Sequence, residues 1–308
     1  MGILTYMISK YTAFLTLIIV IISMKNIEIK RIVKILFAFN LIVLAIHISM
    51  YIIYLLLDSS SLNFLVRNTL EGQVIRYSFF FNHPNVFAMY VFWTVAMYYY
   101  LYFDKIKNMS YFLTIILSIC IYVFPNSKTS ALAILILLIL IFLKKKNIKM
   151  PSAKYIFIIV LIFSIVSIFF IQNSFIMKIN EALSGRITLG KIIFDNYGIN
   201  LFGADVTKGV EETVVNDKYY TNIKIIDSVY YTLLLNYGIV ALLIYTYLIL
   251  GAIKSVDKQG DDIEKVFIIM LIIYGISETT CLSPEIAFPV LFLSKTLKEK
   301  LWKKKLVS

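Results

Sequence analysis

Long uninterrupted apolar runs constrain this 308-residue chain more than any other feature. Hydrophobic residues make up 60% of the sequence and the mean hydropathy is +0.84, whereas globular domains are about 45–50% apolar. The runs are continuous and do not alternate with the period of two that marks membrane β-strands, so helices are expected. These features predict an all-α fold, a polytopic membrane helix bundle.

Nine apolar runs divide the chain. They cover residues 11–24, 35–57, 74–103, 111–124, 131–143, 155–171, 228–250, 266–277 and 286–297. A helix of roughly 20 apolar residues crosses a bilayer, and the sequence therefore predicts about nine spans. The predicted organisation is an N-terminal transmembrane bundle (1–171), one large extracytoplasmic loop (172–227), and C-terminal transmembrane helices with a basic cytoplasmic tail (228–308).

The distribution of basic residues predicts the orientation of these spans. Twenty of the 30 Lys and Arg residues lie in alternate connections, at 25–34, 105–107, 144–154, 254–265 and 295–305. Cytoplasmic connections carry such an excess, so we expect a multi-pass protein of the cell membrane with its N-terminus outside and its C-terminus in the cytoplasm. The net charge of +12 then follows from topology, and no nucleic-acid partner is expected.

Two local signals predict where helices begin and turn within the apolar regions. Pro84 suits the first turn of a helix and disfavours helical geometry at His83, so a helix is expected to begin at the proline. Residues 125–130 predict a turn with Lys128 at its tip, so the runs on either side are expected to form a helical hairpin.

The segment 172–227 is the longest polar stretch of the chain. Loops beyond about 12–15 residues are usually functional or disordered, and this one contains enough apolar residues to fold against the membrane body. It carries Arg186 and Lys191, and Asp227 stands at its end. We expect it to form half of an active site.

Charged and polar side chains from five connections are expected on the outer face. The candidate site residues are Arg76, His83, Lys128, Arg186, Lys191, Asp227 and Glu278. Arginine grips phosphate oxygens in a bidentate manner and lysine acts as a point charge, so the basic candidates suit a diphosphate. A carboxylate or histidine suits a general base. The chain has neither a metal-ligand spacing nor a nucleotide-binding fingerprint, and no metal or cofactor is expected.

Five of these candidates also have an ordinary structural explanation. His83 and Asp227 are alternative N-caps of the helices that follow them. Arg186 follows Ser-Gly and is an alternative solvated start of a short amphipathic helix. For Lys128 the alternative is snorkelling at the membrane interface, and for Glu278 it is an exposed helix end.

The order of several short motifs resembles the O-antigen polymerase and ligase family, which includes the Wzy-type polysaccharide polymerases. The motifs are Asn82-His83-Pro84-Asn85, Ser184-Gly185-Arg186, Leu201-Phe202-Gly203, Asp227-Ser228-Val229-Tyr230 and Asn236-Tyr237-Gly238. The resemblance covers roughly residues 74–297. It implies a glycosyltransferase that joins undecaprenyl-diphosphate-linked oligosaccharide repeat units into capsular polysaccharide or exopolysaccharide at the outer face of the membrane.

The resemblance also implies roles for individual residues. Arg186 falls where the family has its loop arginine, expected at the diphosphate, with Arg76, Lys128 and Lys191 as further candidate ligands. Asp227 stands where the ligase branch has a histidine, which favours a polymerase. The base remains open among Asp227, His83 and Glu278. The expected partners are the lipid-linked oligosaccharide, a polysaccharide chain-length regulator and a flippase.

Two other functions remain open from the sequence, an O-antigen-ligase-like glycan transferase and a transporter (flippase) for lipid-linked oligosaccharides. A flippase is expected to carry charges within several spans, often with repeat symmetry. This chain concentrates its charges in one loop and at the ends of the runs, with Asn40 and His47 deep in a run. The polymerase is therefore the favoured interpretation.

Overall fold

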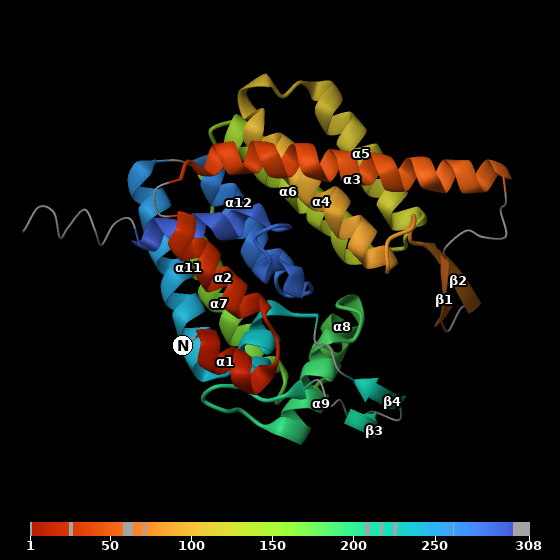
Figure 1. Cartoon of the computed structure of the whole chain (residues 1–308), viewed down its shortest axis with the longest axis vertical. Helices are drawn as coiled ribbons and strands as arrows, with labels where there is room; N and C mark the ends of the chain where they lie inside the picture. Colours follow the sequence, from red (N-terminus) through yellow and green to blue (C-terminus); the bar gives the residue numbers. More distant parts are fainter. Residues whose placement is uncertain are drawn as a thin grey trace, which may run out of the picture. The chain divides into compact units, whose positions relative to one another are not determined.

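The computed structural model describes residues 2–24, 27–57, 64–69, 72–206, 210–215, 218–223, 227–260 and 262–297. These residues form helices and two short antiparallel hairpins (Figure 1). The chain divides into two compact units, one made of Met1–Ile27 with Pro151–Ser308 and the other of Glu28–Met150. The first unit is discontinuous in sequence, because its first helices precede the second unit and its other elements follow it.

The second unit packs around one buried helix. Its elements are α3 (Ile29–Leu57), β1 (Phe64–Thr69), β2 (Gly72–Tyr77), α4 (Pro84–Leu101), the 3-10 helix η3 (Phe103–Lys105), α5 (Asn108–Val123) and α6 (Lys128–Lys145). The strands pair antiparallel with Phe64 opposite Tyr77. Helix α4 forms the core, since Phe92 and Trp93 have no exposed surface. It begins at Pro84, as predicted, and α5 and α6 form the predicted hairpin.

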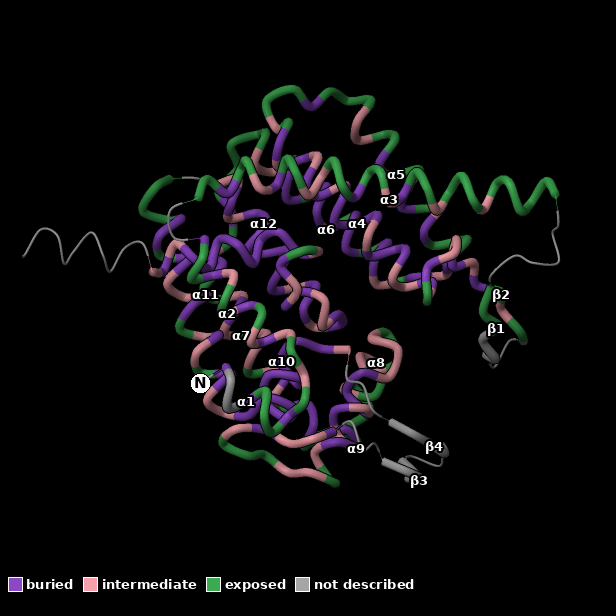
Figure 2. Tube along the Cα trace, viewed as in Figure 1, coloured by how far each residue is buried: buried purple, intermediate pink, exposed green. Residues whose placement is uncertain are grey.

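The first unit packs around α12 (Asp262–Tyr274). Its other elements are α1 (Gly2–Ser9), α2 (Ala13–Ser23), α7 (Ala153–Ser167), α8 (Ser174–Ala182), α9 (Arg186–Tyr197), β3 (Val210–Val215), β4 (Lys218–Ile223), α10 (Val229–Tyr231), the π-helical η5 (Thr232–Asn236), α11 (Ile239–Gln259), and the 3-10 helices η6 (Thr279–Leu282) and η7 (Phe288–Ser294). Helix α12 contacts α7, α11 and η7, and Phe267, Ile269 and Ile272 on it are fully buried. Figure 2 shows α12 buried along most of its length.

The prediction of about nine membrane spans is wrong. Within the described part of the chain, only α3, with 29 residues, and α11, with 21 residues, are long and apolar enough to cross a membrane. The most apolar stretch of α3 is 11% buried and that of α11 is 50% buried. Figure 2 shows α3 exposed along most of its length. The remaining apolar runs form shorter or interrupted helices, and the two hairpins are a further departure from a purely helical bundle.

Backbone geometry explains why the runs did not become spans. The run at 74–103 starts as strand β2 and passes through Phe79 and Phe80, both with positive φ, before its helix begins. The run at 228–250 is interrupted at Gly238, whose φ is 89°. The run at 286–297 is wound largely as the 3-10 helix η7. Apolar composition shows that a segment favours an apolar environment. The length of a helix depends on turns, and hydropathy does not reveal where those turns fall.

Candidate active site

Arg186 is placed by a tight turn between two helices of the predicted outer loop. Helix α8 ends at Ala182, and α9 begins at Arg186. Between them Ser184 and Gly185 adopt left-handed conformations with φ of 55° and 85°, which glycine tolerates without a steric penalty. The side chain of Asn180, on α8, fastens the turn: its Oδ1 accepts hydrogen bonds from the backbone N–H groups of Ile187 (3.0 Å) and Thr188 (3.1 Å).

The guanidinium of Arg186 is buried, and each of its three nitrogens has a partner in the protein. The residue is only 5% exposed. Its Nε donates to the backbone oxygen of Ser277 at 3.1 Å, and its Nη1 donates to the backbone oxygen of Leu183 at 3.1 Å. Its Nη2 lies 3.4 Å from Oε1 of Glu278 and 3.9 Å from Oδ2 of Asp227. The predicted alternative of a solvated loop arginine does not fit this geometry.

Glu278 is a buried carboxyl beside that cation. It is 7% exposed and stands immediately before η6. Burial, reinforced by the nearby carboxylate of Asp227, raises the pKa of Glu278 to about 8, against the lowering effect of Arg186. At neutral pH the carboxyl is therefore mostly protonated, and the 3.4 Å contact is a hydrogen bond from a charged guanidinium to a neutral acid.

Asp227 is the accessible member of the group. Its side chain is 42% exposed. It ends the predicted outer loop, and Ser228 occupies the N-cap position of α10 in its place, so the helix-cap explanation of Asp227 is wrong. Asp227 can meet a ligand while it stays near Arg186. We call Arg186, Asp227 and Glu278 the Arg186 cluster.

Two of the motifs interlock and hold this region together. Gly203, of the Leu-Phe-Gly motif, and Gly238, of the Asn-Tyr-Gly motif, both have positive φ, at 86° and 89°. A Cβ on Gly203 would lie 1.9 Å from the backbone oxygen of Asn236, and one on Gly238 would lie 2.3 Å from the backbone N of Gly203. Backbone hydrogen bonds join the segments, including Val240 N to the oxygen of Leu201 at 3.1 Å. These glycines permit a close backbone contact.

Three predicted site residues lie in the second unit. Arg76 is 7% exposed, and it donates to the backbone oxygen of Pro125 at 3.0 Å and to Oδ1 of Asn85 at 2.5 Å. His83 is the N-cap of α4, where its Nδ1 accepts from the backbone N of Asn85 at 3.1 Å, so its capping role is confirmed. Lys128 is exposed at the start of α6. The His-Pro-Asn motif thus anchors local structure.

Lys191 belongs to the first unit but is engaged within its own helix. Its Nζ lies 2.5 Å from Oδ1 of Asp195, one turn along α9, and 5.4 Å from the ring centre of Phe194. The side chain is 27% exposed. No contact joins Lys191 to the Arg186 cluster among the interactions of the described residues.

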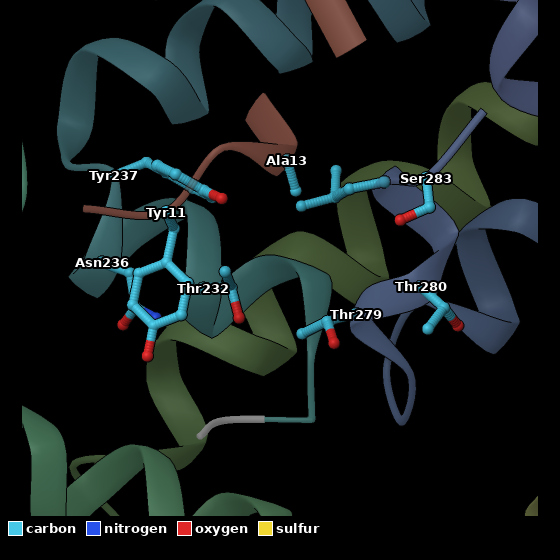
Figure 3. Close-up of a pocket in the computed structure, with 9 residues that line it drawn as sticks. Tyr11, Ala13, Thr232, Asn236, Tyr237, Thr279, Thr280 and Ser283 are labelled. Carbon is cyan, nitrogen blue, oxygen red and sulfur yellow. The ribbon is translucent and has the colours of Figure 1, made fainter. Parts of the chain in front are cut away.

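A small cavity in the first unit involves residues that the sequence analysis did not single out as site residues. Its volume is about 130 Å³. It is lined by Tyr11, Ala13, Thr232, Asn236, Tyr237, Thr279, Thr280, Leu282 and Ser283. Figure 3 shows Tyr11 and Asn236 on one side and Ser283 on the other. The signal that could have found it is the polar residues inside the run 228–250 and in the Thr-Thr pair after Glu278.

The comparisons with known proteins add no assignment. No protein-family model matches this chain, and neither does any curated protein or any solved structure. Within the described residues, no group of three or more His, Cys, Asp or Glu side chains is arranged to hold a metal ion. The chemistry of the site is therefore judged from the Arg186 cluster, which offers a fixed cation, a protonated acid and an accessible carboxylate.

Proposed function

We propose that this protein is a glycosyltransferase that polymerises glycan repeat units carried on a lipid diphosphate. One observation carries the proposal. Carboxyl oxygens of Asp227 and Glu278, from two separate segments, lie within 3.9 Å of the Nη2 atom of Arg186, which comes from a third segment. These are the residues that motif order and charge singled out for diphosphate binding and proton transfer. The order of the motifs supports a member of the polymerase and ligase family, and Asp227, in the place where the ligase branch has a histidine, favours a polymerase.

The Arg186 cluster has the groups that such a transfer requires. An acceptor hydroxyl attacks C1 of the donor sugar, the bond from C1 to the diphosphate oxygen breaks, and the electron pair leaves with the diphosphate. The hydroxyl proton passes to a base, and Asp227 is the carboxylate open to substrate. Arg186 stabilises the negative charge that grows on the leaving group, an interaction that strengthens toward the transition state.

The protonation of Glu278 makes Arg186 suitable for this role. An ionised carboxylate at 3.4 Å would cancel the cation, but the pKa of about 8 leaves Glu278 mostly neutral at neutral pH. Among the residues that the structure describes, the charge of Arg186 is then offset by Asp227 at the longer distance of 3.9 Å. A buried cation also acts through a lower effective dielectric than one in water. Glu278 is a positioning residue for Arg186 in this scheme.

The membrane is the expected site of the reaction, since the donor is a lipid. Helix α3 supports this location, because it is 29 residues long and little of its apolar surface is buried within the protein. Apolar surface of that extent is stable in hydrocarbon and unfavourable in water.

The transporter remains a second candidate because of the same carboxyl. A buried acid with a pKa near 8 beside an arginine takes up and releases a proton close to neutral pH, and ionisable groups of this kind mark proton pathways in membrane proteins. A flippase for lipid-linked oligosaccharides would use Glu278 for coupling and would need no base.

Gene disruption in the native host, followed by analysis of lipid-linked glycans on each membrane face, separates these functions. Loss of polymer with single repeat units accumulating outside is the result expected for a polymerase. Finished polymer that stays on its lipid would indicate a ligase. Units trapped on the cytoplasmic side would indicate a flippase. Unchanged lipid-linked glycans would contradict all three.

A further inference from the structure

We propose that the cavity lined by Tyr11, Thr232 and Ser283 binds one neutral pyranose ring, as a sugar subsite beside the Arg186 cluster. This inference rests on the proposed function for its biological meaning, but binding of the sugar is a property of the cavity alone.

The size of the cavity suits the inner part of a single pyranose. Its volume is about 130 Å³, and an engineered protein cavity of roughly 150 Å³ holds one benzene molecule. A pyranose has more heavy atoms than benzene, so one edge of the bound ring would remain outside the cavity. A disaccharide would not fit inside. Tyr11, one of the lining residues, is partly exposed, and it belongs to the short connection between α1 and α2.

The lining favours a neutral ligand with many hydroxyls. None of the nine lining residues is charged, and burying an unpaired charge there would be costly. Thr232, Thr279 and Ser283 contribute hydroxyls, which both donate and accept hydrogen bonds as sugar hydroxyls do. Tyr11 and Leu282 contribute apolar surface for the C–H face of a ring.

Asn236 adds an acceptor that has no partner among the described residues. The residue is 3% exposed, and its Oδ1 makes no hydrogen bond in the described structure. Buried polar atoms nearly always have a partner, whether protein, water or ligand. An unmet amide oxygen on a residue that lines the cavity therefore points to an occupant with a hydrogen-bond donor.

Two residues that line the cavity lie close in the chain to the carboxylates of the Arg186 cluster. Thr279 directly follows Glu278, so their Cα atoms are about 3.8 Å apart. Thr232 lies five residues after Asp227, in the helical segment formed by α10 and η5. The segments carrying these threonines contact each other, since α10 packs against η6. A ring held here is therefore bound by residues that lie close in the chain to both carboxylates of the proposed chemistry.

Saturation-transfer NMR on the purified full chain tests the proposal. The protein is held in a detergent without a sugar headgroup, and the probes are methyl pyranosides of glucose, galactose, rhamnose and N-acetylglucosamine, with cyclohexanol as the ring lacking most hydroxyls. At least one glycoside is expected to receive saturation from the protein. Thr232→Val and Ser283→Ala are each expected to weaken it by roughly 3- to 10-fold, the effect of one lost hydrogen bond.

Matched variants make the result decisive. Thr16→Val removes an exposed threonine hydroxyl on α2, outside the cavity, and is expected to leave binding unchanged. Arg186→Ala is expected to retain glycoside binding even where it abolishes glycan transfer. Binding that survives both cavity variants, binding of cyclohexanol alone, or no binding to the wild type would overturn the sugar subsite. Failure of the proposed function is seen separately, as normal polymer in cells that carry Arg186→Ala.

Discussion

The guanidinium of Arg186 and the carboxyl of Glu278 are 3.4 Å apart in the interior of the first unit, although 92 positions separate them in the chain. Arginine stays charged at any physiological pH, whereas burial raises the pKa of Glu278 to about 8. The pair is therefore a cation and a neutral acid at neutral pH, and it becomes an ion pair only in mildly alkaline solution. This balance governs both the stability and the proposed activity of the site.

Stability is expected to fall with rising pH because of Glu278. The unfolded chain loses this proton near pH 4.5 and the folded protein keeps it to about pH 8, so the stabilisation is complete below pH 4.5 and is lost between the two values. Glu278→Gln keeps a neutral hydrogen-bonding group. It should exceed the wild type in stability by an amount that grows with pH between about 4.5 and 8 and is on the order of several kcal/mol at the upper end. Thermal unfolding at pH 5, 6, 7 and 8 measures this. A constant difference across the range would refute the assigned protonation.

Glycan transfer is expected to decline above pH 8 in the wild type. Ionisation of Glu278 would then neutralise Arg186 and weaken its hold on the departing diphosphate, by up to about tenfold per pH unit. Glu278→Gln cannot ionise, so its activity should stay level between pH 7 and 9. Transfer rates measured with extracted lipid-linked repeat units check this. The same alkaline decline in both proteins would remove Glu278 from the explanation.

Arg186→Ala is expected to abolish polymer, and Arg186→Lys should remain severely impaired. Lysine keeps the charge, but it cannot donate at once to Ser277 and Leu183 and also face Glu278, as the three nitrogens of Arg186 do. Polymer ladders at matched membrane protein levels give the measurement. Lys178→Ala, an exposed cation on the neighbouring α8, is the control and should be near normal. Full activity in Arg186→Lys would mean that charge alone suffices.

Asp227→Asn is expected to lower polymer yield by roughly 10²–10⁴-fold, the usual contribution of a positioned base. The side chain is 42% exposed and lies outside the helix-cap position, so folding should be nearly unaffected. Thermal unfolding of the purified variant provides the control. Near-normal polymer in Asp227→Asn would exclude it as the base and favour the transporter, which needs none.

Gly238→Ala is expected to destabilise the first unit far more than Gly198→Ala. Both glycines combine positive φ with ψ near 180°, a conformation that costs other residues about 1–3 kcal/mol. Only Gly238 also meets backbone atoms, at 2.3 Å from its added Cβ, whereas Gly198 has nothing within 4 Å. The midpoints of thermal unfolding of the two variants measure the difference. Equal midpoints would show that the backbone around Gly203 and Gly238 can move apart to admit a methyl group without a loss of stability.

Local sequence signals identified several features of this protein correctly. Pro84 predicted the start of α4, and the turn at 125–130 predicted the hairpin of α5 and α6. Such features depend on the φ and hydrogen-bonding preferences of a few neighbouring residues. Residue chemistry also singled out Arg186, Asp227 and Glu278, since arginine suits a diphosphate and a carboxylate suits a general base; their role in a site stays a prediction.

Only the tertiary structure decided which candidates meet. Asp227 and Glu278 lie beside the guanidinium of Arg186. Arg76 and His83 instead make hydrogen bonds within the second unit. Long-range contacts depend on how whole elements pack, and a single sequence carries no direct record of them. The number of spans was overestimated for a related reason, since apolar composition does not report breaks such as the one at Gly238. Apolar patterning and residue chemistry are properties of local sequence, so the sequence by itself determines them. Helix length and the pairing of distant charges depend on packing, so only the tertiary structure determines them.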